Sequence, residues 1–437
     1  MKNHNNQIPK FTALIPLLVF VITFLGIGIY NDDFYVLPAP IAVIVGIVVA
    51  FLMFKQSINS KIDILLKGCG DHKILTMCLI YLLAGAFAAI TNATESVDAI
   101  VNLGMDYIAI EYIYLGIFLI AAFLSISTGT SVGAIVTLAP IVVGFSEQGD
   151  ISLAVLSGAL LGGAMFGDNL SVISDTTIAA TQSLDCKMSD KFKENIKLAL
   201  PAALITLVVL TVQGLDLSSS SLDAVNYEYS VIKIMPYILV ILLSIIGVNV
   251  FITLFFGIIS AGILGVFYGD FTLMESTRIA YDGFTNMTEI FLLSLLTGGL
   301  AALVEKNGGI DYLLNKIKVL IKSKTSAQFG IATLVSTINM AIANNTVSII
   351  ISGSIAKTIN DEYGLTNRKT ASILDIFACI SQGILPYGAQ VLMILSFSKG
   401  QIGYIDLMQN TWYLLILFIT TVLFISLQPV FLKYKKK

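Results

Sequence analysis

The chain alternates between long apolar runs and short polar segments. About 20 apolar residues in a helix span the hydrocarbon core of a bilayer, so each long run predicts a membrane-spanning helix. The clearest runs are 11–30, 38–54, 73–91, 110–126, 197–214, 231–247, 250–268, 288–304, 326–343 and 409–432. The first of them is longer than the apolar core of a signal peptide and is expected to be the first transmembrane helix.

Three other apolar stretches, 131–146, 151–183 and 344–398, are interrupted by Gly, Pro, Asn, Asp, Ser and Thr. Irregular backbone is tolerated at membrane depth only where protein or a water-filled cavity surrounds it. These stretches therefore predict helices that break inside the membrane.

Composition places the chain in lipid. Of its 437 residues, 56% are apolar and 12% are charged, and the mean hydropathy is +0.89. An average soluble protein has about 25% charged residues, so a soluble fold is nearly excluded and the lipid bilayer is an expected partner. The four cysteines lack paired spacing, and with only two histidines they support neither a disulfide framework nor a zinc site. No cofactor and no nucleic-acid partner are expected.

Most of the 25 basic residues lie in the N-terminal segment, in 55–73, 184–197, 305–325 and 356–370, and in the C-terminal tail, whereas the intervening loops are acidic. Cytoplasmic loops are enriched in Lys and Arg. The pattern predicts a multi-pass protein of the cell membrane with both termini in the cytoplasm. Segment 215–230, which has acids but no basic residue, is expected outside.

An internal repeat divides the chain at that segment. Residues 82–90, LLAGAFAAI, match residues 295–303, LLTGGLAAL, without a gap. Basic loop 55–73 corresponds to acidic 269–287, and acidic loop 91–107 to basic 305–325, so the copies are inverted. We expect an all-α polytopic membrane protein with about 10–13 membrane segments and broken or re-entrant helices, in two inverted repeats, 1–214 and 231–437, joined by an external linker, 215–230. This plan is typical of secondary transporters.

The segment 163–177, GAMFGDNLSVISDTT, places Asp168 and Asp175 within an apolar stretch. In a continuous helix residues seven apart share one face, and the glycines before Asp168 would let the helix unwind there. A charge at the bilayer centre costs about 3 kcal/mol or more, so both carboxylates are expected to have a function. The alternative is that they cap broken helices or bond neighbouring ones.

Neutral oxygen ligands are expected beside these carboxylates. They are Asn169, Ser171 and Thr176 in the same segment and Thr130 in the hydroxyl-rich run 125–131. Hydroxyl and carbonyl oxygens suit a small hard cation. The alternative is that these hydroxyls bond their own helix backbone.

The second half carries amides where the first carries acids. One break holds Asn344, Asn345 and Thr346, and the other holds Pro386, which disrupts the helix, between Gln382 and Gln390. Asp375 lies nearer the predicted cytoplasmic end, where either a direct role or a solvated helix start would explain it.

The spacing Gly163-Ala164-x-Phe166-Gly167-Asp168-x-x-Ser171-x-x-Ser174-Asp175-Thr176-Thr177 resembles the signature of the NhaC-type sodium/proton antiporter family. The resemblance implies exchange of cytoplasmic Na⁺ for external H⁺, with this segment as the ion site. Some members of that family move malate, lactate or amino acids. The commonest antiporter pattern has Lys-Met-Ser-Pro-Leu where this chain has 169–173, NLSVI.

A mechanism follows if H⁺ and Na⁺ compete for the same oxygens. Asp168 would bind either ion and Asp175 would be the second carboxylate, with no other metal. The alternative is a Na⁺- or H⁺-coupled carrier of an organic anion or amino acid, favoured by the amides of Asn344, Gln382 and Gln390. An intramembrane aspartyl protease would not need inverted repeats, so no enzyme is expected, and no channel filter is evident. A homodimer is compatible with either reading.

Overall fold

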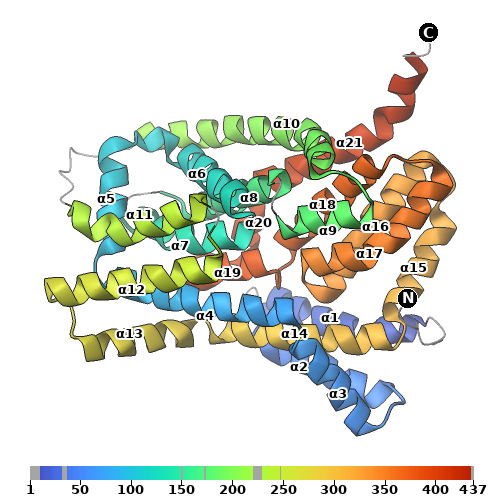
Figure 1. Cartoon of the computed structure of the whole chain (residues 1–437), viewed down its shortest axis with the longest axis horizontal. Coiled ribbons are helices and arrows are strands. Elements are labelled where there is room, and N and C mark those ends of the chain that lie inside the picture. Colours follow the sequence, from blue (N-terminus) through green and yellow to red (C-terminus); the bar gives the residue numbers. More distant parts are fainter. Residues whose placement is uncertain are drawn as a thin grey trace.

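The structure is a computed structural model that describes residues 10–31, 37–148, 151–171, 174–219, 229–246 and 248–434 (Figure 1). Most of the predicted linker and the outermost residues of both termini lie outside these ranges. The first half contains α1 (Ile15–Asn31), α2 (Ala39–Met53), α3 (Ile58–Cys69), α4 (His72–Ala93), α5 (Ser96–Tyr107), α6 (Ile113–Thr128), α7 (Ser131–Gln148), α8 (Leu153–Leu170), α9 (Asp175–Ser183) and α10 (Met188–Leu215).

The second half repeats this order with similar helix lengths. It contains α11 (Val231–Ile245), α12 (Val250–Tyr268), α13 (Leu273–Asn286), α14 (Thr288–Lys306), α15 (Gly309–Leu320), α16 (Lys324–Ile342), α17 (Asn345–Tyr363), α18 (Asn367–Ile384), α19 (Ala389–Ser398), α20 (Tyr404–Gln409) and α21 (Trp412–Tyr434). Helices α1–α9 correspond in order to α11–α19, and α10 corresponds to α21.

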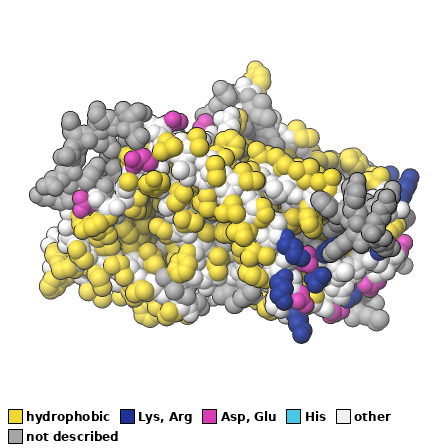
Figure 2. Space-filling view, turned by 90° about the horizontal axis from the view of Figure 1, so that it is seen from above, with side chains coloured by type: hydrophobic (Ala, Val, Ile, Leu, Met, Phe, Trp, Pro, Cys, Tyr) yellow, Lys and Arg dark blue, Asp and Glu magenta, His cyan; other side chains and the backbone are white. Residues whose placement is uncertain are grey.

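The all-helical membrane architecture is confirmed. In the described ranges no residue is in a strand, and eight segments are long and apolar enough to cross a membrane. They are Phe11–Gly28, Ile74–Ala93, Ile110–Thr128, Leu153–Ser183, Met188–Leu215, Val250–Tyr268, Thr288–Lys306 and Asn367–Ser398. Shorter apolar helices add Ala39–Met53, Ser131–Glu147, Val231–Leu243 and Trp412–Leu427. Figure 2 shows a broad apolar face, with Lys and Arg side chains gathered towards one end of the long axis.

The breaks predicted at 125–131 and 163–177, and their counterparts at 344–346 and 382–390, are present in the structure. The break predicted within 131–146 is wrong, because α7 continues through Pro140 to Gln148 without interruption. Helices α6 and α7 meet at Gly129, and α16 and α17 meet at Ala343, each in the left-handed region with φ of 70° and 54°. Helix α8 ends at Leu170 and α9 begins at Asp175, and residues 385–388, with Pro386, separate α18 from α19. These breaks let two helix ends point into the core from each half.

The two halves contact each other reciprocally. A Cβ on Gly85 of α4 would collide with the carbonyl oxygen of Gly283 of α13, and one on Gly68 of α3 with that of Gly298 of α14. Helix pair α4–α13 is therefore mirrored by α14–α3, as expected when a two-fold axis relates two units. These four helices lie together in Figure 1. Inversion across the membrane stays a prediction.

A hydrogen bond between corresponding helices occurs in each half. The Ser125 hydroxyl of α6 donates to the carbonyl oxygen of Ala164 in α8 over 2.6 Å. The Asn339 amide of α16 donates to the carbonyl oxygen of Ala378 in α18 over 2.9 Å. In each half, this bond connects the helix that precedes the first break to the helix that precedes the second break. The broken helices of the two halves are therefore connected in corresponding ways.

Replacing Gly85 with Ala should push α4 away from α13 and lower the free energy of unfolding by about 1–3 kcal/mol, because the added methyl group would overlap the carbonyl oxygen of Gly283. Thermal unfolding in detergent would measure the loss. The matched control is Gly262→Ala in α12, where a Cβ meets no atom within 4 Å, and it should leave the midpoint unchanged or raise it slightly. Equal midpoints for the two variants would contradict the contact.

Candidate functional site

Asp168 lies in the last turn of α8, and its side chain is 3% exposed. The glycines before it serve packing. A Cβ on Gly163 or Gly167 would collide with the backbone of α6 at Phe118 or Ala122. The helix therefore continues through Asp168 to Leu170 and unwinds after it, whereas the sequence predicted unwinding before it.

The carboxylate of Asp168 is contacted by hydroxyl groups. Ser131, the first residue of α7, donates to Oδ2 over 2.8 Å, and Ser174 donates to Oδ1. Ser131 Oγ accepts a hydrogen bond from Nε2 of Gln390 in α19 over 2.9 Å. Among the described residues, no basic side chain forms an ion pair with Asp168.

Ser174 joins this carboxylate to the start of α9. Its Oγ is 2.9 Å from Oγ1 of Thr176 and accepts from the Thr176 backbone N–H over 3.3 Å. Ser174 is thus the N-cap of α9. Thr176 is buried, as expected of a neutral ligand, but it reaches Asp168 through Ser174 rather than directly.

A second buried acid lies beside the first. Asp375 in α18 pairs with Lys191 in α10 over 2.7 Å, and their side chains are 0% and 1% exposed. Lys191 Nζ also donates to the Asn169 carbonyl oxygen over 3.2 Å and to Thr177 Oγ1 over 2.6 Å. Asn195 Nδ2 donates to the same Asn169 oxygen and to Asp375 Oδ2, each over 2.7 Å. The end of α8 is thus bonded to α10 and, through it, to α18.

Sequence reasoning missed Lys191 and Asn195. It placed Lys191 in a cytoplasmic loop, 184–197, but α10 begins at Met188 and turns this side chain into the core. The available signal was spacing: Lys191 and Asn195 are four apart and continue a face that reaches Leu198 and Ala202. Such a face predicts burial. Asp375 is buried, so the alternative of a solvated helix start is wrong.

Asp175 is not brought to Asp168. It is exposed in the first turn of α9. The expectation that both acids share one helix face is wrong, because that face requires a continuous helix and α8 ends at Leu170. Ser171 donates to the Ile126 carbonyl oxygen over 2.9 Å, which ties the break to α6. Thr130 is half-buried, and the neighbouring Ser131 makes the contact to Asp168 that Thr130 was expected to make.

The second-half residues mostly shape their own breaks. Asn344 caps α17 by accepting from the Val347 N–H, and Asn345 accepts from the N–H of Thr346, which is buried. Gln382 lies two residues before the end of α18, as Asp168 does in α8, and donates to the Ala343 carbonyl oxygen over 3.2 Å. Of this set, only Gln390 is hydrogen-bonded to the Asp168 cluster.

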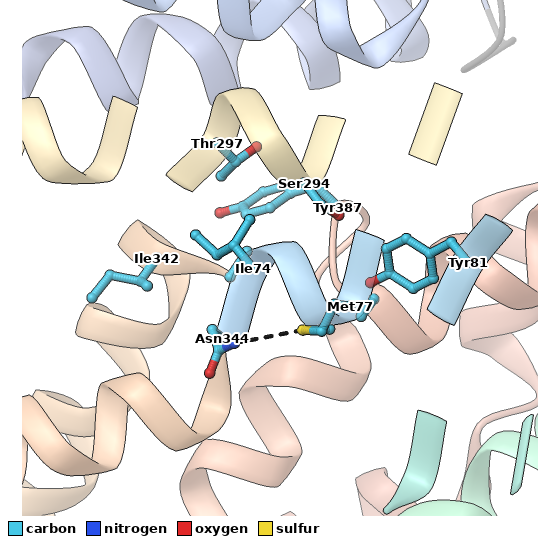
Figure 3. Close-up of a pocket in the computed structure, with 10 residues that line it drawn as sticks. Ile74, Met77, Tyr81, Ser294, Thr297, Ile342, Asn344 and Tyr387 are labelled. Atoms are coloured by element: carbon cyan, nitrogen blue, oxygen red, sulfur yellow. Dashed lines mark hydrogen bonds between the residues drawn. The ribbon is translucent and has the colours of Figure 1, made fainter. Parts of the chain in front are cut away.

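A cavity of about 20 Å³ adjoins the second-half breaks (Figure 3). Asn344 faces it and donates to Met77 Sδ over 3.6 Å, while Tyr81 and Tyr387 border it. A volume of this size holds about one water molecule. Asp168 is not among the residues that line this cavity.

Comparison with known proteins gives one consistent result. The sequence model described as the Na⁺/H⁺ antiporter family matches residues 7–215 and 211–428. The chain is 26% identical to a Malate-2H⁺/Na⁺-lactate antiporter of Bacillus subtilis, over 89% of this chain and 90% of that protein. It is 24% identical to an uncharacterized Na⁺/H⁺ antiporter of Haemophilus influenzae (94% of each) and 24% identical to the Na⁺/H⁺ antiporter NhaC of B. subtilis (73% and 76%).

The Ser174 cap can be tested without transport. Ser174→Ala should loosen the start of α9 by about 1 kcal/mol and speed deuterium exchange of its first amides about fivefold, because the Thr176 N–H loses its acceptor. Ser57→Ala, which removes the exposed N-cap of α3, should affect α3 alone. Unchanged exchange in α9 would show that Ser174 does not hold it.

Proposed function

The chain belongs to the Na⁺/H⁺ antiporter family, and from this premise we propose that it exchanges Na⁺ for H⁺ at Asp168 by alternating access. One observation carries the proposal. Asp168 is a buried carboxylate that accepts hydrogen bonds from the hydroxyl groups of Ser131 and Ser174, and no basic side chain in the described ranges pairs with it. A buried charge requires compensation, and here a proton or a sodium ion supplies it.

The surrounding oxygens suit both ions. When Asp168 is ionised, Ser131 and Ser174 donate to it. When Na⁺ is bound, the same hydroxyls rotate and offer lone pairs, so Asp168, Ser131 and Ser174 supply hard oxygen ligands without further charge. When Asp168 is protonated, it donates to a hydroxyl instead. The ions therefore exclude each other at one carboxylate, which is sufficient for antiport.

The hydrogen bond from Gln390 to Ser131 connects this site to the second half. Ser131 is the first residue of α7 and Gln390 is the second residue of α19, so two helix starts from different halves meet beside Asp168. Movement of one half against the other would change access to Asp168 from either side, as alternating access between repeats requires. The two stretches matched by the family, which meet at 211–215, support two halves.

Lys and Arg side chains gather at one end of the molecule (Figure 2). This supports a protein of the cell membrane that has its basic end, and both termini, on the cytoplasmic side. Na⁺ would then leave the cytoplasm as H⁺ enters. Asp175, which is exposed, lies outside the proposed ligand set.

Transport of an organic solute is a second candidate, because one relative is named a malate and lactate antiporter. Gln382 Oε1 and Gln390 Oε1 are buried and have no hydrogen-bond partner in the described part of the chain, which would suit a solute donor. The hydroxyl groups that Ser131 and Ser174 place on the Asp168 carboxylate favour the ion. In proteoliposomes with an internal pH dye, we expect a Na⁺ pulse to move protons without any added organic acid. A response only when malate, lactate or an amino acid is present would favour the second candidate.

Asp168→Asn should reduce Na⁺-driven proton movement in inside-out vesicles to the level of empty vesicles, because the amide can neither carry the proton nor neutralise Na⁺. Asp175→Asn is the matched control and should retain most of the exchange. Exchange retained in Asp168→Asn with unchanged pH dependence would refute the assignment.

Competition at one carboxylate also predicts a kinetic pattern. At a pH where Asp168 is mostly protonated, the apparent KM for Na⁺ should rise about tenfold for each unit by which the pH falls on the side of the membrane from which Na⁺ binds. The reason is that Na⁺ binds only to the ionised carboxylate. The maximal rate should stay constant. Initial rates over a grid of Na⁺ and pH would measure it, and Asp175→Asn should show the same slope. A change in maximal rate alone would indicate separate sites.

A further inference from the structure

The exchange proposed at Asp168 leaves the buried ion pair between Lys191 and Asp375 unexplained. We propose that Lys191 is the resident cation of a second acidic site, formed by Asp375, Asn169 and Thr177, which it keeps closed to transported cations. The inference rests on the proposed function, because it explains why only one of two buried carboxylates is available for exchange.

The ammonium group fills this site completely. A lysine ammonium has three N–H donors, and Lys191 has three acceptors in Asp375 Oδ2, the Asn169 carbonyl oxygen and Thr177 Oγ1, at 2.6–3.2 Å. Its side chain is 1% exposed. Ammonium and carboxylate thus compensate each other out of contact with water, and breaking such a pair by removing one partner leaves a buried charge.

Without the ammonium, the remaining groups would make a cation site. A carboxylate, a backbone carbonyl and a hydroxyl are hard oxygen ligands. Three further buried oxygens have no hydrogen-bond partner among the described groups: Asp375 Oδ1, Asn169 Oδ1 and Oδ1 of Asn195, which donates to both of these residues. Oxygen atoms therefore outnumber donors in this part of the core, which favours a positive charge there.

Charge balance then sets how many ions the molecule carries. Lys191 pairs with Asp375 and also donates to the carbonyl oxygen of Asn169, the residue after Asp168, so the three charged groups lie in one part of the core. With Lys191 charged, the three groups sum to one negative charge, which one Na⁺ or one H⁺ neutralises. Without Lys191 they would sum to two, and a second monovalent cation would be required.

The Asn169 carbonyl oxygen joins this pair to the exchange site. It accepts from Lys191 and Asn195, and Asn169 directly follows Asp168. A purely structural role for Lys191 is therefore the alternative that an experiment must separate. A structural role predicts loss of stability alone, whereas the resident cation also predicts a change in the number of bound ions.

The experiment counts ²²Na⁺ bound per purified chain in detergent at alkaline pH and measures the Hill coefficient for Na⁺. We expect about one ion in the wild type. Lys191→Met should bind about two, with a Hill coefficient above 1, because Asp375 is then uncompensated. The matched control Lys191→Met/Asp375→Asn, which has no charge at the pair, should return to one ion.

Two results would overturn the proposal. One is Lys191→Met and the double variant binding the same number of ions, which would leave the pair a structural one. The other is two Na⁺ ions bound per wild-type chain, which would show that Na⁺ displaces the Lys191 ammonium group from Asp375. Asp168→Asn tests the proposed function separately: one ion retained in that variant refutes the site at Asp168, whereas the resident cation is judged on the pair of Lys191 variants.

If Lys191→Met does not fold, Asp375→Asn provides the test. It leaves the ammonium without its partner beside Asp168, so Na⁺ binding at Asp168 should weaken by about tenfold or more through repulsion between like charges. Unchanged Na⁺ affinity in that variant would contradict compensation of Lys191 by Asp375.

Discussion

Burying the carboxylate of Asp168 in an apolar core is the constraint on which the arrangement around it depends. Close packing of α8 against α6, through Gly163 and Gly167, carries the helix end into the core. Unwinding after Leu170 then brings Ser174 back to the carboxylate, and the start of α7 brings Ser131. These hydroxyls solvate the carboxylate without neutralising it, and the proposed binding of a cation at Asp168 depends on this.

The two halves use one scaffold for different chemistry. Gln382 occupies in α18 the position of Asp168 in α8, and Asp375 occupies the position of Leu161, seven residues earlier in each helix. The first half therefore presents an acid that is hydrogen-bonded to hydroxyl groups, and the second presents an amide at that position and an acid that is paired with Lys191. Corresponding helices place these groups at corresponding positions. A few residue differences between the halves decide which of the two acids has an ion-pair partner among the described residues.

Much of the fold could be predicted because lipid imposes simple rules. Apolar runs of spanning length, breaks marked by Gly, Pro and Asn, and the match between 82–90 and 295–303 are local features, and each depends on few residues. The motif around Asp168 was visible for the same reason, since an acid in an apolar stretch is rare. Lys191 was misplaced because the concentration of basic residues in 184–197 indicated a cytoplasmic loop, and this outweighed the helical spacing that Lys191 shares with Asn195.

The sequence by itself indicated the lipid solvent, most of the helices and most of the breaks, and it singled out Asp168 as an acid whose charge requires compensation. Tertiary structure decided which groups compensate it. Asp175, seven residues away in the chain, is exposed, whereas Ser131 and Gln390 come from distant segments, and Lys191 meets Asp375 across the two halves. The reason is physical: electrostatic compensation acts over a few ångströms in space, and only packing sets which residues are that close.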